Sequence, residues 1–537
     1  MCALDSLAHA LLLLTRLNRA TDASGVPLPS RLRVDGFEPW WFGQEQLFWQ
    51  QLVPYAQWQA TASRAEGPTG AARTPGENDV ASRLSGAGAA CQPPDGGGGA
   101  SHLRAALRQL GLAATSLWSL LLWRLSGRDT LLYTIDKVTP GADHDVRISG
   151  IYRELRLRGY RFGEYVHVND AAEAWPNALK RRRPVVFFES LTNLGALLLA
   201  SAEVCPSPAP APALDGAGPG DAFVREVAAG ALSRAALSAR RLRILKWLLR
   251  VQGARRAVIL DDSRHANELI AACKALGIPT LGYMHGLLNR YHPGLMAYGF
   301  GRARRHTFDL YGLWSEYFRR RVLAGDLYAE EGTFVCGPLR PPSPEQFVSL
   351  SETSRRDVPP LRVLLITEPR APLAEIRRYL AELVGDSRFR VALKIRPGDR
   401  IAYVDESVGA LPETIDGGSV HDAVLNSDVV LGTYSTALYE AALALRPVVV
   451  LNTSFTYGHD LVYDGLAELA ESPETVCNTV LKAARLPQLE LAARRTCVWG
   501  EDFGDGACKL LDRAEAQLWE RPLPRKSQPR QAPTGQR

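Results

Sequence analysis

The chain has 537 residues, of which 46% are apolar and 22% are charged, as is ordinary for a globular protein that folds in water. The length allows about three domains, and a formal net charge of +6 without a nucleic-acid-binding motif gives no reason to expect a nucleic-acid partner. Eight scattered cysteines without a CxxC pair exclude a disulfide framework, and the ten histidines show no HExxH or HxxxH spacing, so we expect no metal site.

The N-terminal region, residues 1–58, is predicted to be a small helical extension. Its apolar run Ala8–Leu14 has no preceding basic residue and no cleavage site, which argues against a signal peptide. Four tryptophans lie between Arg33 and Trp58. Residues 59–100 are rich in Gly, Ala, Ser and Pro and cannot bury enough apolar surface to fold, so we expect a disordered linker.

The most hydrophobic segment is Leu110–Leu125, which is short for a membrane span and contains Arg124. We expect a buried helix that packs on the following lobe. The alternative is a helix at a membrane interface, anchored by Trp118 and Trp123.

Two series of short apolar strands alternate with helical segments in the rest of the chain. The first series, in residues 101–340 with a flexible insert at 205–221, contains Leu131–Asp136, Val185–Ser190, Ala257–Asp262, Thr280–Met284, Asp309–Trp314 and Thr333–Cys336. The second, in residues 341–520, contains Val363–Thr367, Val391–Ile395, Val429–Leu431 and Val448–Leu451. Residues 521–537 hold five basic and no acidic residues and are predicted to be a disordered tail.

This alternation predicts an α/β protein with two Rossmann-like lobes, each a doubly wound parallel sheet. Ligands bind beyond the carboxyl ends of the strands in such sheets, so we expect the two lobes to face a cleft.

The segment Asp428–Leu451 carries the clearest signal for a ligand. A buried strand, Val429–Leu431, is followed by Ser435 and Thr436 at the start of a helix that ends before Pro447. The N–H groups and the positive dipole end of such a helix favour a phosphate, and Glu440, about one turn later, is placed to accept hydrogen bonds from a ribose. The alternative is an ordinary capped helix with a solvated glutamate.

Three further polar positions follow strands. His285, beside Gly286, is a candidate general base because the unperturbed pKa of a histidine side chain lies near neutrality, the alternative being a structural turn histidine. Lys394 and Arg396 alternate along a strand end and would both face one phosphate, or else are solvated charges. Asp143 or Asp145, in the loop after the first strand, is a second candidate base or a solvated carboxylate.

Taken together, the motifs of residues 130–510 resemble those of the GT-B-fold transferases of bacterial surface-polysaccharide and teichoic-acid synthesis, which include CDP-glycerol glycerophosphotransferases and capsule sialyltransferase-like enzymes. The matching motifs in chain order are His285-Gly286, His292-Pro293-Gly294, Leu313-Trp314, Gly337-Pro338-Leu339-Arg340, Lys394 to Pro397, and Ser435-Thr436 with Glu440. Arg396 replaces the histidine of the family's KxHP motif, and arginine also binds phosphate.

The resemblance implies a metal-independent glycosyltransferase or glycerophosphotransferase without a cofactor. Its donor would be a nucleotide-activated sugar or CDP-glycerol, held by Lys394, Arg396, Ser435, Thr436 and Glu440 of the second lobe. His285 would deprotonate a hydroxyl of a glycan or lipid-linked acceptor. We expect a cytoplasmic protein, or one bound peripherally to the inner face of the plasma membrane. The alternative functions are a nucleotide-sugar epimerase of the same architecture and a non-catalytic scaffold in polysaccharide assembly.

Overall fold

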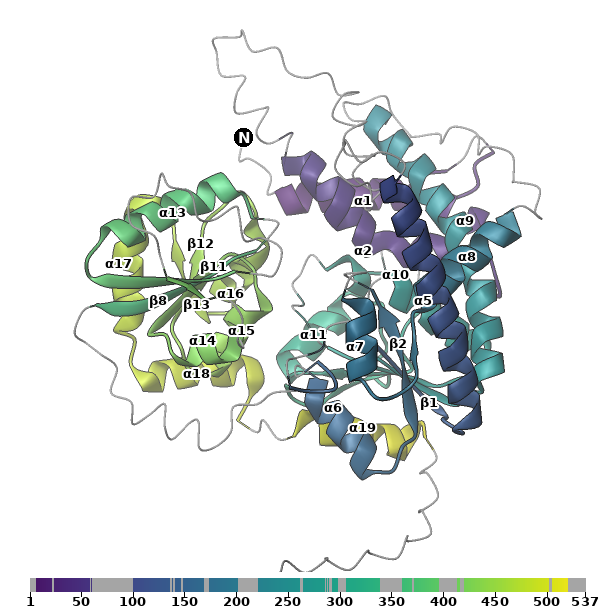
Figure 1. Ribbon diagram of the computed structural model, residues 1–537. Coiled ribbons are helices and arrows are strands. Elements are labelled where there is room, and N and C mark those ends of the chain that lie inside the picture. The colour runs from purple at the N-terminus through teal and green to yellow at the C-terminus, as the bar shows by residue number, and fades with distance from the viewer. Residues whose placement is uncertain are drawn as a thin grey trace, which may run out of the picture.

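The computed structural model contains two parallel β-sheets, each flanked by helices (Figure 1). An N-terminal extension contacts both lobes. The structure describes residues 6–57, 59, 100–338 and 360–519, apart from 22–23, 136–137, 139–140, 146–147, 169–172, 201–220, 261–263, 285, 287, 289–291, 298–305, 369–370, 396–412, 416–419 and 502–504. The predicted linker, the insert and the basic tail lie almost entirely outside the described residues.

The first lobe contains a seven-stranded sheet in the order β3-β2-β1-β4-β5-β6-β7, with every neighbouring pair parallel. Its strands are β1 (Thr130–Ile135), β2 (Phe162–His167), β3 (Val185–Val186), β4 (Arg256–Ile259), β5 (Thr280–Tyr283), β6 (Leu310–Leu313) and β7 (Thr333–Val335). Strands with two buried faces have continuous apolar sequences, and this explains why most of these runs were predictable.

The helices of the first lobe include two long ones that lie along one side of the sheet. These are α5 (Ala100–Leu125) and α9 (Asp221–Gln252), which pack with α8 (Phe188–Ala200) and α10 (Arg264–Ala275) (Figure 1). The remaining helices are α6 (Ser149–Leu157), α7 (Ala174–Lys180) and α11 (Glu316–Ala324).

The second lobe contains a six-stranded parallel sheet in the order β10-β9-β8-β11-β12-β13. Its strands are β8 (Leu361–Ile366), β9 (Phe389–Lys394), β10 (Glu413–Ile415), β11 (Val429–Gly432), β12 (Val448–Leu451) and β13 (Ala467–Ala470). Its helices are α13 (Leu373–Gly385), α14 (Val420–Leu425), α15 (Thr436–Leu443), α16 (Asp460–Tyr463), α17 (Pro473–Ala484) and α18 (Gln488–Trp499). The predicted fold class, two doubly wound α/β lobes, is therefore confirmed.

The sequence patterns missed three strands and misjudged one. Strands β2, β10 and β13 carry glycine or acidic residues that interrupt the apolar run, so they gave no clear strand pattern. The predicted strand Val185–Ser190 ends at Val186, because the helix α8 begins at Phe188.

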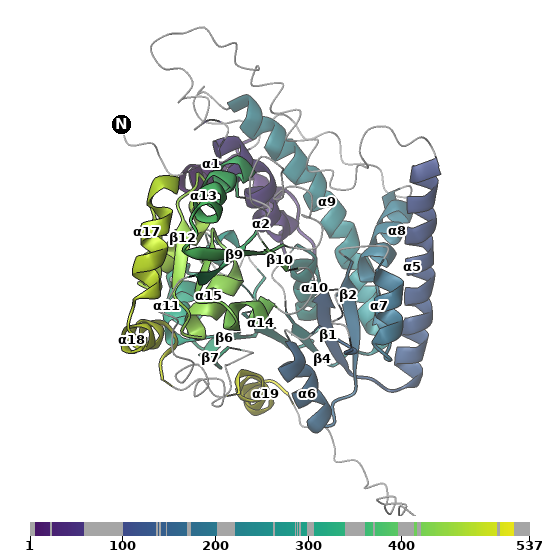
Figure 2. The same cartoon turned by 60° about the vertical axis from the view of Figure 1, so that its left-hand side comes forward.

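The last described helix, α19 (Gly506–Gln517), returns to the first lobe, although residues up to 520 were assigned to the second. It packs against α6 (Figure 2). Arg158 pairs with Asp512 at 2.8 Å and with Glu515 at 3.3 Å, and the Tyr160 hydroxyl donates to Glu515 at 2.9 Å. The chain therefore crosses between the lobes at least twice.

The N-terminal extension consists of short helical elements: α1 (Ser6–Arg19), η1 (Leu28–Arg31), η2 (Pro39–Gly43), α2 (Gln44–Leu47) and the π-helical turn η3 (Phe48–Leu52). Most of its contacts are with α9 and α10 of the first lobe, where Asn267 donates to the carbonyl of Phe42 at 3.1 Å. It also reaches the second lobe. The Trp49 ring lies 4.6 Å from that of Tyr457, edge to face, and the Ser6 hydroxyl donates to the Ser454 carbonyl at 3.2 Å.

Helix α5, expected to be buried, is buried on one face only. Leu112, Leu120 and Trp123 pack into the lobe. On the other face Leu117 and Trp118 retain 53% and 61% of their accessible surface. The segment is apolar on all sides, but the lobe covers only the side that meets β3, α8 and α9. Among the described residues, no helix is long and apolar enough to cross a membrane.

Candidate functional site

The turn between β11 and α15 has the local structure that the sequence predicts. Ser435 precedes the helix in an extended conformation and its hydroxyl accepts from the N–H of Ala437 at 3.3 Å. Thr436 is the first helical residue, and Glu440 lies half-buried one turn further along α15. Because β11 is a central strand, this helix start lies at the middle of the sheet's carboxyl edge.

Two neighbouring residues that the sequence reasoning missed shape this turn. Thr433 is buried and its hydroxyl has no hydrogen-bond partner among the described residues. Gly458 comes so close that a Cβ atom there would lie 1.6 Å from the Thr433 carbonyl oxygen, so only glycine fits. The loop after β12 therefore covers the turn and leaves an unsatisfied buried hydroxyl beside the start of α15.

Lys394 and Arg396 were expected to bind the diphosphate of the donor that Ser435 and Thr436 would also contact. Lys394 is the last residue of β9 and is half-buried, whereas Arg396 lies outside the described residues. Strand β8 separates β9 from β11, so the two strand ends are about 10 Å apart. Thr367 and Glu368, both buried, follow β8 between them. A carboxylate in this position is suited to hydroxyl groups rather than to phosphate.

The candidate base His285 also lies outside the described residues. Strand β5 ends at Tyr283, two residues before it, and the Met284 N–H donates to the Gly312 carbonyl of β6 at 2.9 Å. His292, in the related HPG motif, is buried beside the short helix η5 (Pro293–Leu295).

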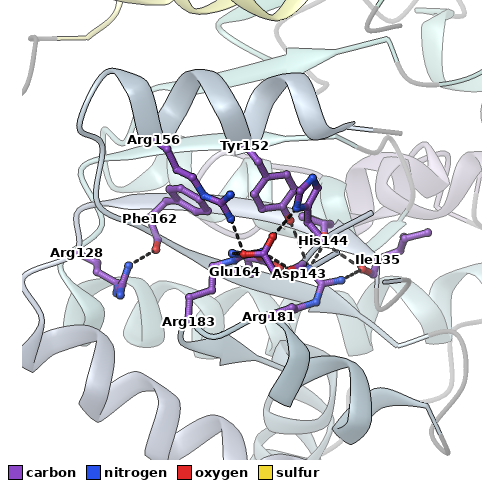
Figure 3. Close-up of polar contacts among 11 residues, drawn as sticks. Arg128, Ile135, Asp143, His144, Tyr152, Arg156, Phe162, Glu164, Arg181 and Arg183 are labelled. Carbon is purple, nitrogen blue, oxygen red and sulfur yellow. Dashed lines mark hydrogen bonds and ion pairs between the residues drawn. The ribbon is translucent and has the colours of Figure 1, made fainter. Parts of the chain in front are cut away.

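Asp143 is neither a solvated carboxylate nor a free base, contrary to both sequence interpretations. His144 Nδ1 lies 2.6 Å from Oδ1, while Arg156 and Arg183 donate to Oδ2 at 2.5 and 2.8 Å (Figure 3). Burial opposes ionisation, but the hydrogen bonds from His144 and Arg183 outweigh it and hold the pKa of the Asp143 carboxyl well below 3.8. A carboxylate so stabilised is a poor proton acceptor. Asp145, the other candidate, is buried.

The same network continues into the interior through Glu164 of β2. This fully buried carboxylate pairs with both Arg181 and Arg183 (Figure 3). Arg181 also donates to the Ile135 carbonyl at 2.6 Å and so ties the end of β1 to the loop before β3. We assign this cluster to the structure of the sheet edge rather than to catalysis.

A second polar cluster of the first lobe, also missed by the sequence reasoning, contains His167, Glu189 and His265. His167 ends β2, Glu189 is in the first turn of α8 after β3, and His265 is in the first turn of α10 after β4. The two histidines both approach Glu189 Oε1, His167 through a hydrogen bond and His265 Nε2 at 3.5 Å. These residues are far apart in sequence, so no motif spacing pointed to them.

The lobes are also connected by Arg321 of α11. Its guanidinium contacts Asp460 at 2.9 Å and Asp464 at 2.7 Å, both in the second lobe. Tyr439 of α15 donates to Asp464 at 3.1 Å. The helix whose start is the candidate anion site is thus linked to the interface between the lobes.

Comparison with known proteins gives similarity to solved structures only: no protein-family model matches, and neither does any curated protein sequence. A glycotransferase of kitacinnamycin has 13% identity and a TM-score of 0.44, covering 73% of this chain and 99% of that one. A putative UDP-N-acetylglucosamine 2-epimerase from Listeria monocytogenes has 12% identity and a TM-score of 0.46, covering 74% and 98%. The UDP-GlcNAc 2-epimerase of Methanocaldococcus jannaschii, solved with UDP-GlcNAc and UDP, has 13% identity and a TM-score of 0.45, covering 72% and 99%. At this level of similarity the activities of these proteins do not carry over to this chain.

Proposed function

We propose that this protein transfers a glycosyl or glycerophosphate unit from a nucleotide-activated donor to a hydroxyl of a surface-polysaccharide acceptor. The second lobe would bind the donor, and the first lobe would bind the acceptor. The acceptor would be a glycan or a lipid-linked glycan, and the enzyme would work in the cytoplasm or at the inner face of the plasma membrane.

The observation that carries the proposal is the turn between β11 and α15. A capped helix start at the carboxyl edge of a parallel sheet offers backbone N–H groups and a positive dipole end to a phosphate. The buried Thr433 hydroxyl without a described partner adds an unused donor beside it. Glu440 one turn away and Lys394 two strands away would contact the ribose and the diphosphate of the same donor.

Thermal stability measured with CMP, CDP, UDP and CDP-glycerol tests the donor site. A nucleotide present at 100 times its dissociation constant stabilises the folded protein by about 2.7 kcal/mol. We expect one nucleotide base to raise the melting temperature, and Ser435→Ala/Thr436→Ala to abolish this shift. The control is Ser472→Ala/Thr475→Ala, which removes the capping box of α17 in the same lobe. Each lost cap costs about 1 kcal/mol, so both variants lose similar stability. If nucleotide raised the melting temperature of the two variants equally, the assignment of the donor site to Ser435 and Thr436 would be wrong.

Turnover with the identified donor tests the proposed base. His285→Asn removes the titratable group and keeps a side chain that forms hydrogen bonds. General-base catalysis contributes about 100- to 10,000-fold, so we expect a fall of that size with unchanged nucleotide binding, and a smaller fall for His292→Asn. Wild-type turnover of His285→Asn would remove His285 from the mechanism.

Interconversion of nucleotide sugars without an acceptor would indicate an epimerase, and the absence of any nucleotide binding would indicate a scaffold.

A further inference from the structure

The cluster of His167, Glu189 and His265 joins three strand ends of the first lobe. Its ligand atoms, one from each residue, all lie within 4.8 Å of one another, and all three side chains are half-buried. Strands β2, β3 and β4 all lead into the same carboxyl edge of the sheet. The three groups therefore converge at the edge where this kind of sheet places its ligands.

A second carboxylate lies behind His265. The Nε2 atom of His265 lies 3.5 Å from Glu189 Oε1, and its Nδ1 atom lies 3.7 Å from Glu268 Oε2, within ion-pair distance but longer than a hydrogen bond. Glu268 is fully buried, accepts from the Ser238 hydroxyl at 2.6 Å and lies 3.5 Å from Arg241. A histidine that turns one nitrogen to a site and the other to a held carboxylate has the arrangement typical of metal ligands.

One of the three spacings between the ligand atoms also fits a bound ion. A tetrahedral Zn²⁺ with bonds of about 2.1 Å keeps its ligand atoms about 3.4 Å apart. His265 Nε2 and Glu189 Oε1 are 3.5 Å apart, close to this value. The His167–Glu189 hydrogen bond is shorter, and an ion would replace its proton and separate the two atoms.

We propose that His167, Glu189 and His265 form a binding site for a divalent ion of the zinc class. Two imidazole nitrogens and one carboxylate favour Zn²⁺ and similar transition metals over Mg²⁺ or Ca²⁺, which prefer oxygen ligands. Three protein ligands leave the fourth position of a tetrahedral ion for water or an oxygen of a bound ligand. The site is independent of the proposed donor site, which needs no metal. A metal ion bound here would contradict the expectation from the sequence that the protein has no metal site.

Calorimetric titration of the full-length protein tests this proposal. The protein is first stripped with a chelator and its cysteines are blocked with N-ethylmaleimide, so that thiolates do not compete. We expect ZnCl₂ to bind at one ion per chain without any nucleotide, and CoCl₂ to give a visible absorption spectrum of nitrogen and oxygen ligands. MgCl₂ should not bind at comparable concentrations. A wild-type protein that takes up no zinc at micromolar concentrations would overturn the site.

The variants locate the ion. His167→Ala, Glu189→Gln and His265→Ala should each weaken zinc binding by at least about 100-fold, and Glu268→Gln by about 10- to 100-fold through the orientation of His265. His421→Ala, which removes a histidine of α14 in the second lobe, is the matched control and should bind as the wild type. Zinc should raise the melting temperature of the wild type and of this control, and should not do so for the three ligand variants at the same zinc concentration. Undiminished binding in the three ligand variants would mean that zinc binds elsewhere and would overturn the proposal. Because a variant that unfolds would also lose zinc, circular dichroism and the conservative variants His167→Gln and His265→Gln check that folding is retained.

Discussion

At the scale of single residues, Asp143 shows how neighbours decide what a carboxylate does. Two arginines and a histidine surround it, and one of the arginines, Arg183 in the loop before β3, also pairs with the buried Glu164. Removing one member of such a network leaves the other charges without compensation. The role of Asp143 is therefore to hold charges in place at the edge of the sheet.

Asp143→Asn should lower the free energy of unfolding at pH 7 by about 1–2 kcal/mol. Hydrogen bonds to buried charged groups contribute more than this, but the Asp143 carboxyl is partly exposed and solvent weakens its interactions. The folded-state pKa is depressed, so this contribution is present above 3.8 and is lost as the pH falls below it. Urea unfolding at pH 7 and below pH 3.8 measures the change. The difference in the free energy of unfolding between the variant and the wild type should be smaller below pH 3.8 than at pH 7.

Asp512→Asn is the control, because this carboxylate pairs with Arg158 but its side chain is 61% exposed. We expect it to change the stability by less than about 1 kcal/mol. A difference for Asp143→Asn that is the same at both pH values would contradict the assigned role.

At the scale of elements, α5 is the helix whose surroundings differ most from expectation. Its described outward face carries Leu107, Leu110, Leu117, Trp118, Leu121, Leu122 and Leu125 as exposed apolar residues. The exposed charged residues of the same described stretch are Arg108 and Arg124, and no acidic residue is present in it. Apolar and cationic side chains without acidic ones are typical of helices that lie in the interface of an anionic membrane.

We predict that the protein sediments with vesicles containing anionic phosphatidylserine and not with neutral phosphatidylcholine vesicles. Leu117→Ser/Trp118→Ser should reduce the bound fraction at least about tenfold, because these two side chains supply much of the apolar area that would enter the membrane. The control, Tyr463→Ser/Leu489→Ser, removes two exposed apolar residues of the second lobe and should bind as the wild type. Equal binding of both variants would show that α5 is not the contact.

At the scale of the whole molecule, several contacts among the described residues hold the lobes together. The extension touches the second lobe through Trp49, α19 returns to α6, and Arg321 reaches Asp460 and Asp464. In the Arg321 contact both carboxylates are nearly buried, with side chains that are 3% exposed. Burial raises the pKa of Asp464 even though Arg321 opposes this shift.

Arg321→Gln should lower the free energy of unfolding by about 3–5 kcal/mol, because it leaves two buried carboxylates without their cation. We also expect calorimetry to resolve two transitions instead of one as the lobes unfold separately. Arg319→Gln on the same helix is the control. Its partners Glu316 and Glu330 are 56% and 73% exposed, so the loss should be about 0–1 kcal/mol. Equal losses of unfolding free energy in the two variants would contradict the role of Arg321 in holding the two lobes together.

The sequence by itself determined the type of most elements and the fold class. Apolar runs such as Val429–Leu431 and Val448–Leu451, the serine cap at Ser435 and the stop before Pro447 are local signals, because helix and strand preferences depend on nearby residues. The binding roles of Ser435, Thr436, Glu440, Lys394, Arg396 and His285 remain predictions.

Only the tertiary structure decided which distant side chains meet and which faces stay exposed. Glu189 and His265 are 76 residues apart, and it is the order of β2, β3 and β4 in the sheet that brings them together with His167. Likewise, the apolar sequence of α5 does not tell which face the lobe covers, and the sequence of α19 does not tell which lobe it joins. The physical reason is that burial and electrostatic partners depend on packing between segments that are remote in the chain, for which local sequence patterns carry no signal.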